Sequence, residues 1–279
     1  MIDPSGPLAL ALSSGAIGGL VAPDSPAFDT LDAAARRYVR PVSVAVTGRR
    51  GVGRDTMADA LHRRFGVTAS VTGDGRDVLA ADLVVHVLAG APRRSDRQIL
   101  AASPRERTVV VLGKADTLDA DAVDRIVRAA CDSLGTPVVA VSQLSASVKV
   151  SEADLEFLRG LVEAGETLPS MSGRFLAAAP AHSPSWRMRS DMLRRLDAAG
   201  IRCALSLIAR DDAAAADAAT LTEYLWGTSG FDGLSVELGA RMPAVAEHRA
   251  AHVRASLESA AAAGADRDNI ELLLRTGGG

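Results

Sequence analysis

The stretch PVSVAVTGRRGVGRDTMADALHRRFG, residues 41–66, decides the fold of this chain. Its first part, residues 41–47, is a β-branched run that predicts a buried strand, and Gly48 begins a glycine-rich turn. Apolar residues then recur at helical spacing over residues 55–65, and Gly66 has the position of a helix C-cap. Strand, glycine turn and helix in this order form the first unit of an α/β fold.

The chain continues as apolar strands that alternate with amphipathic helices. Further strands are predicted at residues 67–71, 81–88, 108–112 and 137–141, and a last one at residues 201–209 (IRCALSLIA). Such alternation is typical of a mainly parallel sheet covered on both faces, so we expect a three-layer α/β/α fold. We expect three parts: an N-terminal segment at 1–39, the α/β domain at 40–210, and a helical C-terminal extension at 211–279.

The composition is that of an ordinary globular protein. The chain has 279 residues, of which 48% are hydrophobic and 23% are charged, and its net charge is -3. Basic residues are mixed with acidic ones and aromatics make up only 3%, which argues against a nucleic-acid-binding groove. Only two residues, Lys114 and Lys149, are lysines, so the position of each is informative.

Two features bear on the cellular compartment. The cysteines, Cys131 and Cys203, lie in apolar segments without a C-x-x-C motif, which favours buried thiols in a reducing compartment. The apolar stretch at residues 7–22 has no preceding basic residue and is shorter than the roughly 18 to 20 residues that a membrane span needs. We therefore expect a cytoplasmic protein without an integral membrane segment.

The glycine turn is the main chemical motif. Gly48 and Gly53 have the G-x-x-x-x-G spacing of a phosphate-binding P-loop, and Gly51 lies between them, after a strand and before a helix. Small residues there allow backbone N–H groups to surround phosphate oxygens at the positive end of the helix. Arg54 and Asp55 take the places of the usual lysine and hydroxyl residue. The alternative, a tight strand-to-helix turn without a ligand, stays open.

A resemblance to P-loop GTPases follows from two later motifs. Gly113-Lys114-Ala115-Asp116, directly after the strand TVVVL, resembles the N-K-x-D motif that recognises guanine, and VSQLSA at residues 141–146 resembles the S-A loop of that family. The resemblance implies a P-loop NTPase-type fold, with GTP or GDP as the ligand. It also implies that Asp116 accepts two hydrogen bonds from guanine, that Lys114 lies along the ring, and that Ser145 and Ala146 line the base site.

The resemblance extends over residues 40–260. The segment ADLVVHVLAG with SDRQIL is similar to Era-like and bacterial dynamin-like GTPases, and MLRRLDAAGIRCALSLIA with FDGLSVELGARM is similar to the end of actinobacterial dynamin-like G domains. Between the first helix and ADLVV, however, only residues 66–80 are available for the two switch segments of the family. Asp74 and Asp77 are the only acids there, and neither begins a D-x-x-G motif.

These departures predict a pseudo-GTPase with impaired or absent hydrolysis that acts through protein contacts. Gly113 lacks the Asn side chain that ties the base site to the P-loop in the family, which weakens the expected affinity. Asp55 would repel a phosphate by about 3 to 4 kcal/mol per unit charge at an effective dielectric near 20. A metal between them would offset this repulsion, so binding of Mg²⁺ stays open.

Two other classes of protein remain as alternatives. GRRGVGRDTMADAL is also similar to the G-K-D-T loop of nucleoside monophosphate kinases, in which Thr56 would contact phosphate, although the chain lacks a clear arginine-rich lid. The third possibility is a scaffold protein without a nucleotide, whose C-terminal helix presents the apolar residues Leu234, Val236, Leu238, Met242 and Val245 to a partner. We favour the interpretation that this stripe packs on the chain's own sheet.

Overall fold

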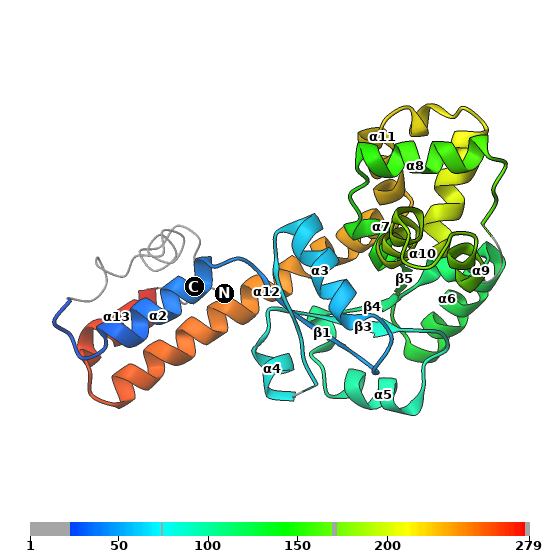
Figure 1. Cartoon of the computed structure of the whole chain (residues 1–279). Helices are drawn as coiled ribbons and strands as arrows, with labels where there is room; N and C mark the ends of the chain where they lie inside the picture. Colours follow the sequence, from blue (N-terminus) through cyan, green and yellow to red (C-terminus); the bar gives the residue numbers. More distant parts are fainter. Residues whose placement is uncertain (1–22, 74, 169–171, 277–279) are drawn as a thin grey trace.

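The computed structural model of the chain describes residues 23–73, 75–168 and 172–276 (Figure 1). Its centre is a five-stranded sheet in which every pair of neighbouring strands is parallel. The strand order is β2-β1-β3-β4-β5, so the direction of the connections reverses between β1 and β3. The strands are β1 (Ser43–Gly48), β2 (Thr68–Val71), β3 (Leu83–Leu88), β4 (Thr108–Leu112) and β5 (Val138–Ala140).

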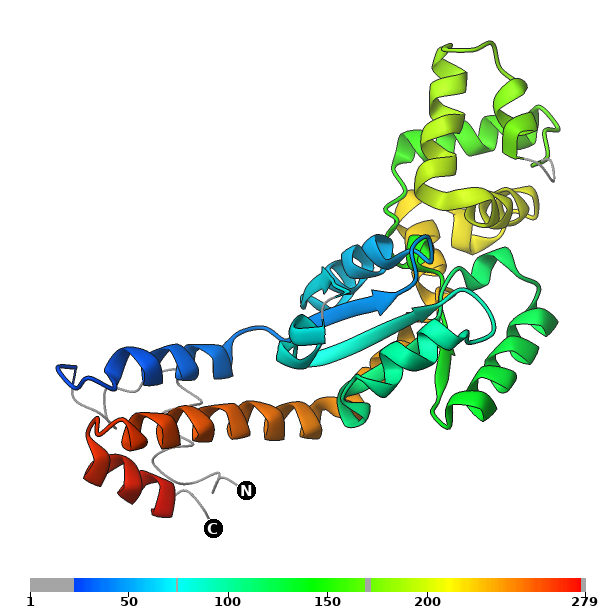
Figure 2. The ribbon, with the colours of Figure 1, turned by 90° about the horizontal axis from the view of Figure 1, so that it is seen from below.

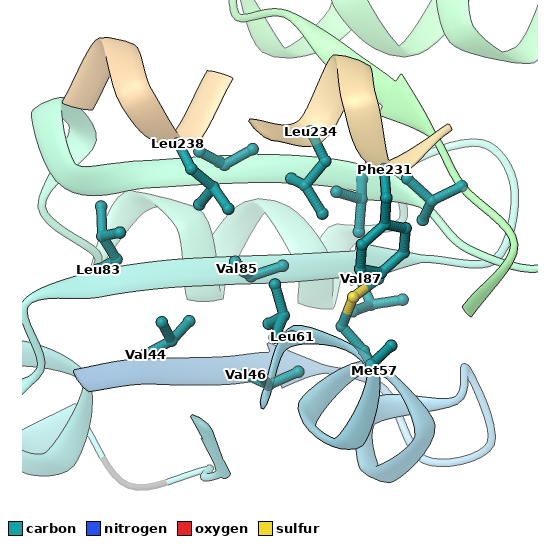
Figure 3. Packing of buried hydrophobic residues seen from close by; sticks show 14 of the residues in the cluster. Val44, Val46, Met57, Leu61, Leu83, Val85, Val87, Phe231, Leu234 and Leu238 are labelled. Atoms are coloured by element: carbon teal, nitrogen blue, oxygen red, sulfur yellow. The ribbon is translucent and has the colours of Figure 1, made fainter. Parts of the chain in front are cut away.

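Helices cover both faces of this sheet, which gives the three layers predicted from the sequence. One face packs against α3 (Arg54–Phe65) and α12 (Phe231–Ala262) in a shared apolar core (Figure 3). The other face packs against α5 (Arg94–Ala101) and α6 (Ala120–Leu134). The central strands β3 and β4 are buried along their whole length, as their continuous Val and Leu runs require.

The apolar stripe of α12 lies against the sheet rather than facing solvent. Leu234, Leu238 and Val245 are buried in the first core, and Phe231 stacks on Phe65 with 5.8 Å between ring centroids. Val236 and Met242 are the exceptions, since their side chains are 71% and 39% exposed. The stripe is therefore mostly used within the chain.

A second apolar core belongs to helices alone. It joins α8 (Glu152–Glu163), α9 (Ser172–Ala177), α10 (Pro184–Ala209) and α11 (Ala218–Gly227), with the 3-10 turn η3 (Ala213–Ala215). This helical unit lies beyond the carboxyl ends of the strands, where α10 faces the segments that follow β4 and β5 (Figure 1). Its core includes residues on both sides of residue 210, so the cores of the molecule do not follow the domain limit expected there.

The C-terminal half of α12 extends away from the sheet as an arm. There it packs against α2 (Phe28–Val39) and α13 (Arg267–Thr276) in a third apolar core (Figure 2). The arm thus brings residues from the expected N-terminal segment and the expected C-terminal extension together. Residues 1–22, which include the apolar stretch 7–22, lie outside the described residues.

The strand predicted at residues 201–209 is wrong, because this segment is the second half of α10. Its buried residues Ile201, Ala204 and Leu205 have the spacing of one helix face, and they complete the core of the helical unit. Short apolar runs suit a buried strand and a buried helix equally, and here packing against other helices decides. In the described part of the chain, the sheet ends with β5.

The remaining elements are short connections around the sheet. They are α4 (Gly75–Ala80), α7 (Gln143–Ser147), and the 3-10 turns η1 (Arg105–Arg107) and η2 (Ala115–Thr117). Within residues 23–73, 75–168 and 172–276, none of the helices combines the length and apolarity that crossing a bilayer would need.

Candidate functional site

The predicted motifs gather at one edge of the sheet. The glycine loop follows β1, the Lys114 motif follows β4, and the Ser145 motif follows β5. Because all strands are parallel, these three loops leave the sheet at its carboxyl edge, next to the reversal of connections between β1 and β3. Open α/β sheets bind their ligands at such a reversal.

The glycine loop has a conformation that only glycine adopts easily. Gly48, Gly51 and Gly53 have φ angles of 135°, 83° and 90°. At Gly48 a Cβ atom would lie 2.6 Å from the carbonyl oxygen of Val87, so β1 and β3 approach too closely there for any side chain. The spacing that identifies this loop in the sequence therefore has a structural cause at each glycine.

The loop ends at the uncapped N-terminus of α3. Gly53 is the N-cap residue and provides no side-chain hydrogen bond. Across the described residues, the backbone N–H groups of Arg54, Asp55 and Thr56 have no acceptor. Such N–H groups, together with the positive end of the helix dipole, favour an anion.

The three side chains that follow the loop differ in exposure. Arg54 and Thr56 are half-buried and Asp55 is exposed. None of these side chains forms a hydrogen bond or ion pair with another described residue. Over the described part of the chain, no three His, Cys, Asp or Glu side chains lie close enough together to hold a metal ion. The side chains present thus do not form a metal site by themselves.

Lys114 crosses from the second loop to the glycine loop. Its Nζ donates a hydrogen bond to the carbonyl oxygen of Gly51 at 3.2 Å, and its Cε lies 3.7 Å from the position of a Cβ on Gly53. The backbone of Lys114 is left-handed, with a φ of 57°, which is uncommon for a residue with a side chain. The structure therefore brings Lys114 into contact with the glycine loop.

Gln143 belongs to this site, although sequence reasoning did not single it out. It is the first residue of α7, which follows β5; it is only 2% exposed, and its Oε1 accepts a hydrogen bond from the backbone N–H of Lys114 at 2.8 Å. The signal that could have pointed to it is Gly113, because a glycine in place of Asn leaves room for another side chain.

Asp116 and Ser145 lie next to a different hollow. Both line a cavity of about 410 Å³ whose far wall is formed by Ala199, Gly200 and Cys203 of α10. Asp116 is half-buried, and its carboxylate has no hydrogen-bond or ionic partner elsewhere in the described chain. No residue of the glycine loop lines this cavity, so the two halves of the predicted site do not form one continuous hollow.

The last two residues of the segment that resembles the S-A loop, Ser145 and Ala146, lie in different surroundings. Ser145 is 8% exposed, and its Oγ accepts a hydrogen bond from Ser142 Oγ at 2.9 Å. Ala146 is fully buried in the core shared with α3, so its methyl group faces apolar residues.

A series of polar contacts connects β1, β3 and α5 to the glycine loop. Thr47 Oγ1 lies 2.9 Å from His86 Nδ1, and His86 Nε2 lies 3.3 Å from Asp96 Oδ1. The other oxygen of Asp96 lies 3.4 Å from Nε of Arg49, the first residue of the loop. Burial lowers the pKa of His86, and the neighbouring Asp96 opposes this only in part. His86 is therefore held neutral near pH 7 as a structural link between β1, β3 and the loop.

Only residues 66–82 lie between α3 and β3, where the GTPase family has its two switch segments. Residues 66–80 contain the strand β2 and the six-residue helix α4, where a simple turn was expected. The carboxylate of Asp77 accepts a hydrogen bond from Thr72 Oγ1 at 3.0 Å, which holds it within this segment. Asp74 lies outside the described residues.

Three arginines between residues 97 and 107 contact neighbouring elements of the fold. Arg97 donates to Ser133 Oγ at 2.9 Å, Arg105 donates to the carbonyl of Gly135 at 2.7 Å, and the buried Arg107 donates to the carbonyl of Ala81 at 2.5 Å. These contacts join β3, β4 and α6 at the opposite edge of the sheet from the glycine loop.

No protein-family model matches this chain, and no curated protein is similar enough to match it.

Proposed function

We propose that the chain is a pseudo-GTPase: a regulatory protein that binds a guanine nucleotide at the carboxyl edge of its sheet, hydrolyses it poorly or not at all, and acts through protein contacts. The observation that carries the proposal is the contact between the two predicted motifs, in which Lys114 Nζ lies 3.2 Å from the carbonyl oxygen of Gly51. The two motifs are separated by more than 60 residues in sequence. Their meeting at a ligand-binding edge is what a shared nucleotide site requires.

The phosphate half of the proposed site is the glycine loop. The free N–H groups of Arg54, Asp55 and Thr56 point to an oxyanion, and the Arg54 guanidinium supplies positive charge in place of a lysine. The strand order itself is shared by unrelated α/β proteins, so it supports a ligand at this edge without selecting the family.

The base half of the proposed site is the loop that follows β4. The unpaired carboxylate of Asp116 is able to accept two hydrogen bonds from neighbouring N–H groups of a base, and guanine presents such a pair. A purine that reaches from this carboxylate to the loop would lie along the stem of Lys114, whose Cε is close to Gly53.

The proposal of poor hydrolysis rests on the region around α3 and β2. Efficient phosphoryl transfer needs a metal ion and a positioned water. The exposed Asp55 and the half-buried Thr56 do not amount to a metal site, and the segment between α3 and β3 contains only β2 and α4.

A second candidate function, a scaffold that binds no nucleotide, is favoured by one observation. The cavity beside Asp116 is lined by no residue of the glycine loop, and its other wall belongs to the helical unit. In this interpretation the hollow is a gap between the sheet and the helices, and Lys114 serves only to brace the loop.

Calorimetric titration of the whole chain distinguishes these functions. GDP, GTP, ADP, ATP and inorganic pyrophosphate are each titrated with and without Mg²⁺, and thermal unfolding is followed in parallel. Binding of guanine nucleotides in preference to adenine nucleotides, with GTP turnover no faster than the buffer blank, supports the pseudo-GTPase. Preference for adenine nucleotides supports the kinase-like alternative, and absence of binding to all five supports the scaffold.

A further inference from the structure

The space beside Gly113 is filled by a side chain from another loop. A Cβ atom on Gly113 would overlap Nε2 of Gln143 and would lie 2.9 Å from Cγ1 of Val87. Gly113 is itself buried at the end of β4. The glycine is therefore required by its surroundings: the carboxamide of Gln143 occupies the volume that a side chain at position 113 would take.

The same carboxamide touches both loops of the proposed nucleotide site. Its Oε1 accepts a hydrogen bond from the backbone N–H of Lys114 at 2.8 Å. Its Nε2 lies 3.5 Å from the carbonyl oxygen of Val52 and 3.2 Å from the position of a Cβ on Gly53, both in the glycine loop. One buried side chain thus connects the loop after β1 with the loop after β4.

The hydrogen bond between Gln143 and the Lys114 backbone also affects where the Lys114 side chain lies. Lys114 has a left-handed backbone, which costs free energy for a residue with a Cβ atom unless the surroundings hold it. The hydrogen bond to Gln143 holds this backbone, and the same conformation directs Nζ to the carbonyl of Gly51. Lys114 and Gln143 therefore form two parallel links between the loops.

We propose that Gln143 is the positioning residue of the site: it joins the Lys114–Asp116 loop to the glycine loop, in place of the side chain that Gly113 lacks. This role in ligand binding rests on the proposed nucleotide function. It also bears on the weaker affinity expected from Gly113, since a connection between the two loops is made instead from the first residue of α7.

The test is a reciprocal exchange of the two residues in the whole chain. Gly113→Asn alone introduces a side chain into occupied space, so the midpoint of thermal unfolding should fall by several degrees. Gln143→Ala alone removes both hydrogen bonds and should also lower it. In the Q143A background the same Gly113→Asn change meets only Val87, so it should lower the midpoint by clearly less than it does in the parent chain.

The affinities for GDP and pyrophosphate show whether Gln143 positions the binding site or only stabilises the fold. Gln143→Ala should weaken GDP binding by roughly tenfold, the effect of losing one or two hydrogen bonds, and should leave inorganic pyrophosphate binding within about twofold. The G113N/Q143A double variant should recover most of the GDP affinity. Gln143→Glu, which keeps the acceptor for Lys114 but loses the donor to Val52, should give an intermediate affinity. Lys149→Ala, which removes an exposed side chain two residues after this helix, is the matched control and should change neither property.

The possible failures are distinguishable. Equal losses from Gly113→Asn in both backgrounds overturn the inference, whether or not any nucleotide binds. If the loss is smaller in the Q143A background but GDP affinity is unchanged by Gln143→Ala, Gln143 is only structural and the positioning role is lost. Should the parent chain bind no nucleotide, the proposed function fails, while the difference between the two Gly113→Asn losses still decides whether Gln143 occupies the place of a side chain at 113.

Discussion

Arg249 in the middle of α12 holds both carboxylate oxygens of Asp82, the residue directly before β3. Its Nε lies 3.0 Å from Oδ1 and its Nη2 lies 2.8 Å from Oδ2. The Asp82 side chain is fully buried and the Arg249 side chain is 12% exposed. Arg249 also donates to the carbonyl of Tyr38 at 2.6 Å, so this one side chain joins the sheet to the arm at the place where the arm begins.

Arg249→Ala should destabilise the chain strongly, because it leaves the buried Asp82 carboxylate without its ionic partner. Removing one member of a buried pair costs about 3–5 kcal/mol in free energy of unfolding. Urea denaturation followed by circular dichroism measures it. The matched control on the same helix is Arg254→Ala, whose ion pair with Glu258 is about half exposed and should be worth at most about 1 kcal/mol. Equal losses for the two variants would contradict the assignment.

The same ion pair predicts a dependence of stability on pH. Burial by itself would raise the pKa of Asp82, but hydrogen bonds from Arg249 and Ser43 outweigh it and lower the pKa from 3.8 to about 2. The stabilisation is therefore complete above pH 4 and is lost as the pH falls from about 4 towards 2. Asp154 contributes with the same sign, since hydrogen bonds from Arg195 and Ser151 lower its pKa despite its burial.

Acid titration of stability checks this sign. The free energy of unfolding of the parent chain should decrease between about pH 4 and pH 2, and Arg249→Ala should flatten the part of the decrease that comes from Asp82. The part from Asp154 should remain in that variant. A parent curve that rises on acidification would be incompatible with these pKa shifts.

Gly230→Ala should destabilise the junction between β5 and α12. Gly230 has a φ of 79°, and a Cβ atom there would overlap the carbonyl oxygen of Ala140. Crowding of this kind costs about 1–3 kcal/mol, and strain at positive φ adds to it. Gly239→Ala is the control within α12, where nothing lies within 4 Å of the added atom; it should stabilise by up to about 1 kcal/mol. Thermal unfolding of both variants measures the contrast.

Phe231→Ala tests whether α12 belongs to the core of the sheet. The ring is fully buried against Phe65, and its removal should cost about 3–5 kcal/mol. Val236→Ala, one turn further on the exposed face, should lie within about 0.5 kcal/mol of the parent. If Phe231→Ala were as mild as Val236→Ala, the helix would not pack on the sheet as the structure has it.

The two lysines form a natural pair for the proposed nucleotide site. Lys114→Ala removes the link to Gly51 and the stem beside Gly53, and should weaken GDP binding by about tenfold or more. Lys149→Ala removes an exposed side chain from the segment before α8 and should leave GDP affinity unchanged. Calorimetric titration compares the two variants. Similar losses in both would mean that bulk positive charge, rather than the position of Lys114, controls binding.

The limits of β4 were predictable because its composition, its length and its flanking residues all indicate a strand. Residues 108–112 were predicted and observed with the same limits, since a run of Val and Leu between polar turns is long enough for a strand and too short for a helix. Residues 201–209 were mispredicted for the opposite reason: the run is apolar, but its length and spacing also suit a helix face, and the neighbours in space decide.

Within the candidate site, the sequence alone indicates those positions at which the backbone conformation admits only one residue type. The positive φ angles of Gly48 and Gly53 require glycine, so the loop is visible in the sequence. Gln143 was not predictable, because a glutamine after a strand has no distinctive pattern. Its importance depends on the absence of a side chain at Gly113, which is 30 residues earlier in the chain and adjacent only in the folded state.

The amino-acid sequence by itself determined the parallel sheet, the glycine loop and the order of the motifs, because these depend on local backbone preferences and on the period of apolar residues. Tertiary structure alone decided that residues 201–209 are helical, that α12 serves two cores, and that Gln143 and Lys114 connect the loops. Those features depend on which side chains meet in the folded chain and which volumes they fill. These contacts join residues that are far apart in the sequence, so no local pattern encodes them.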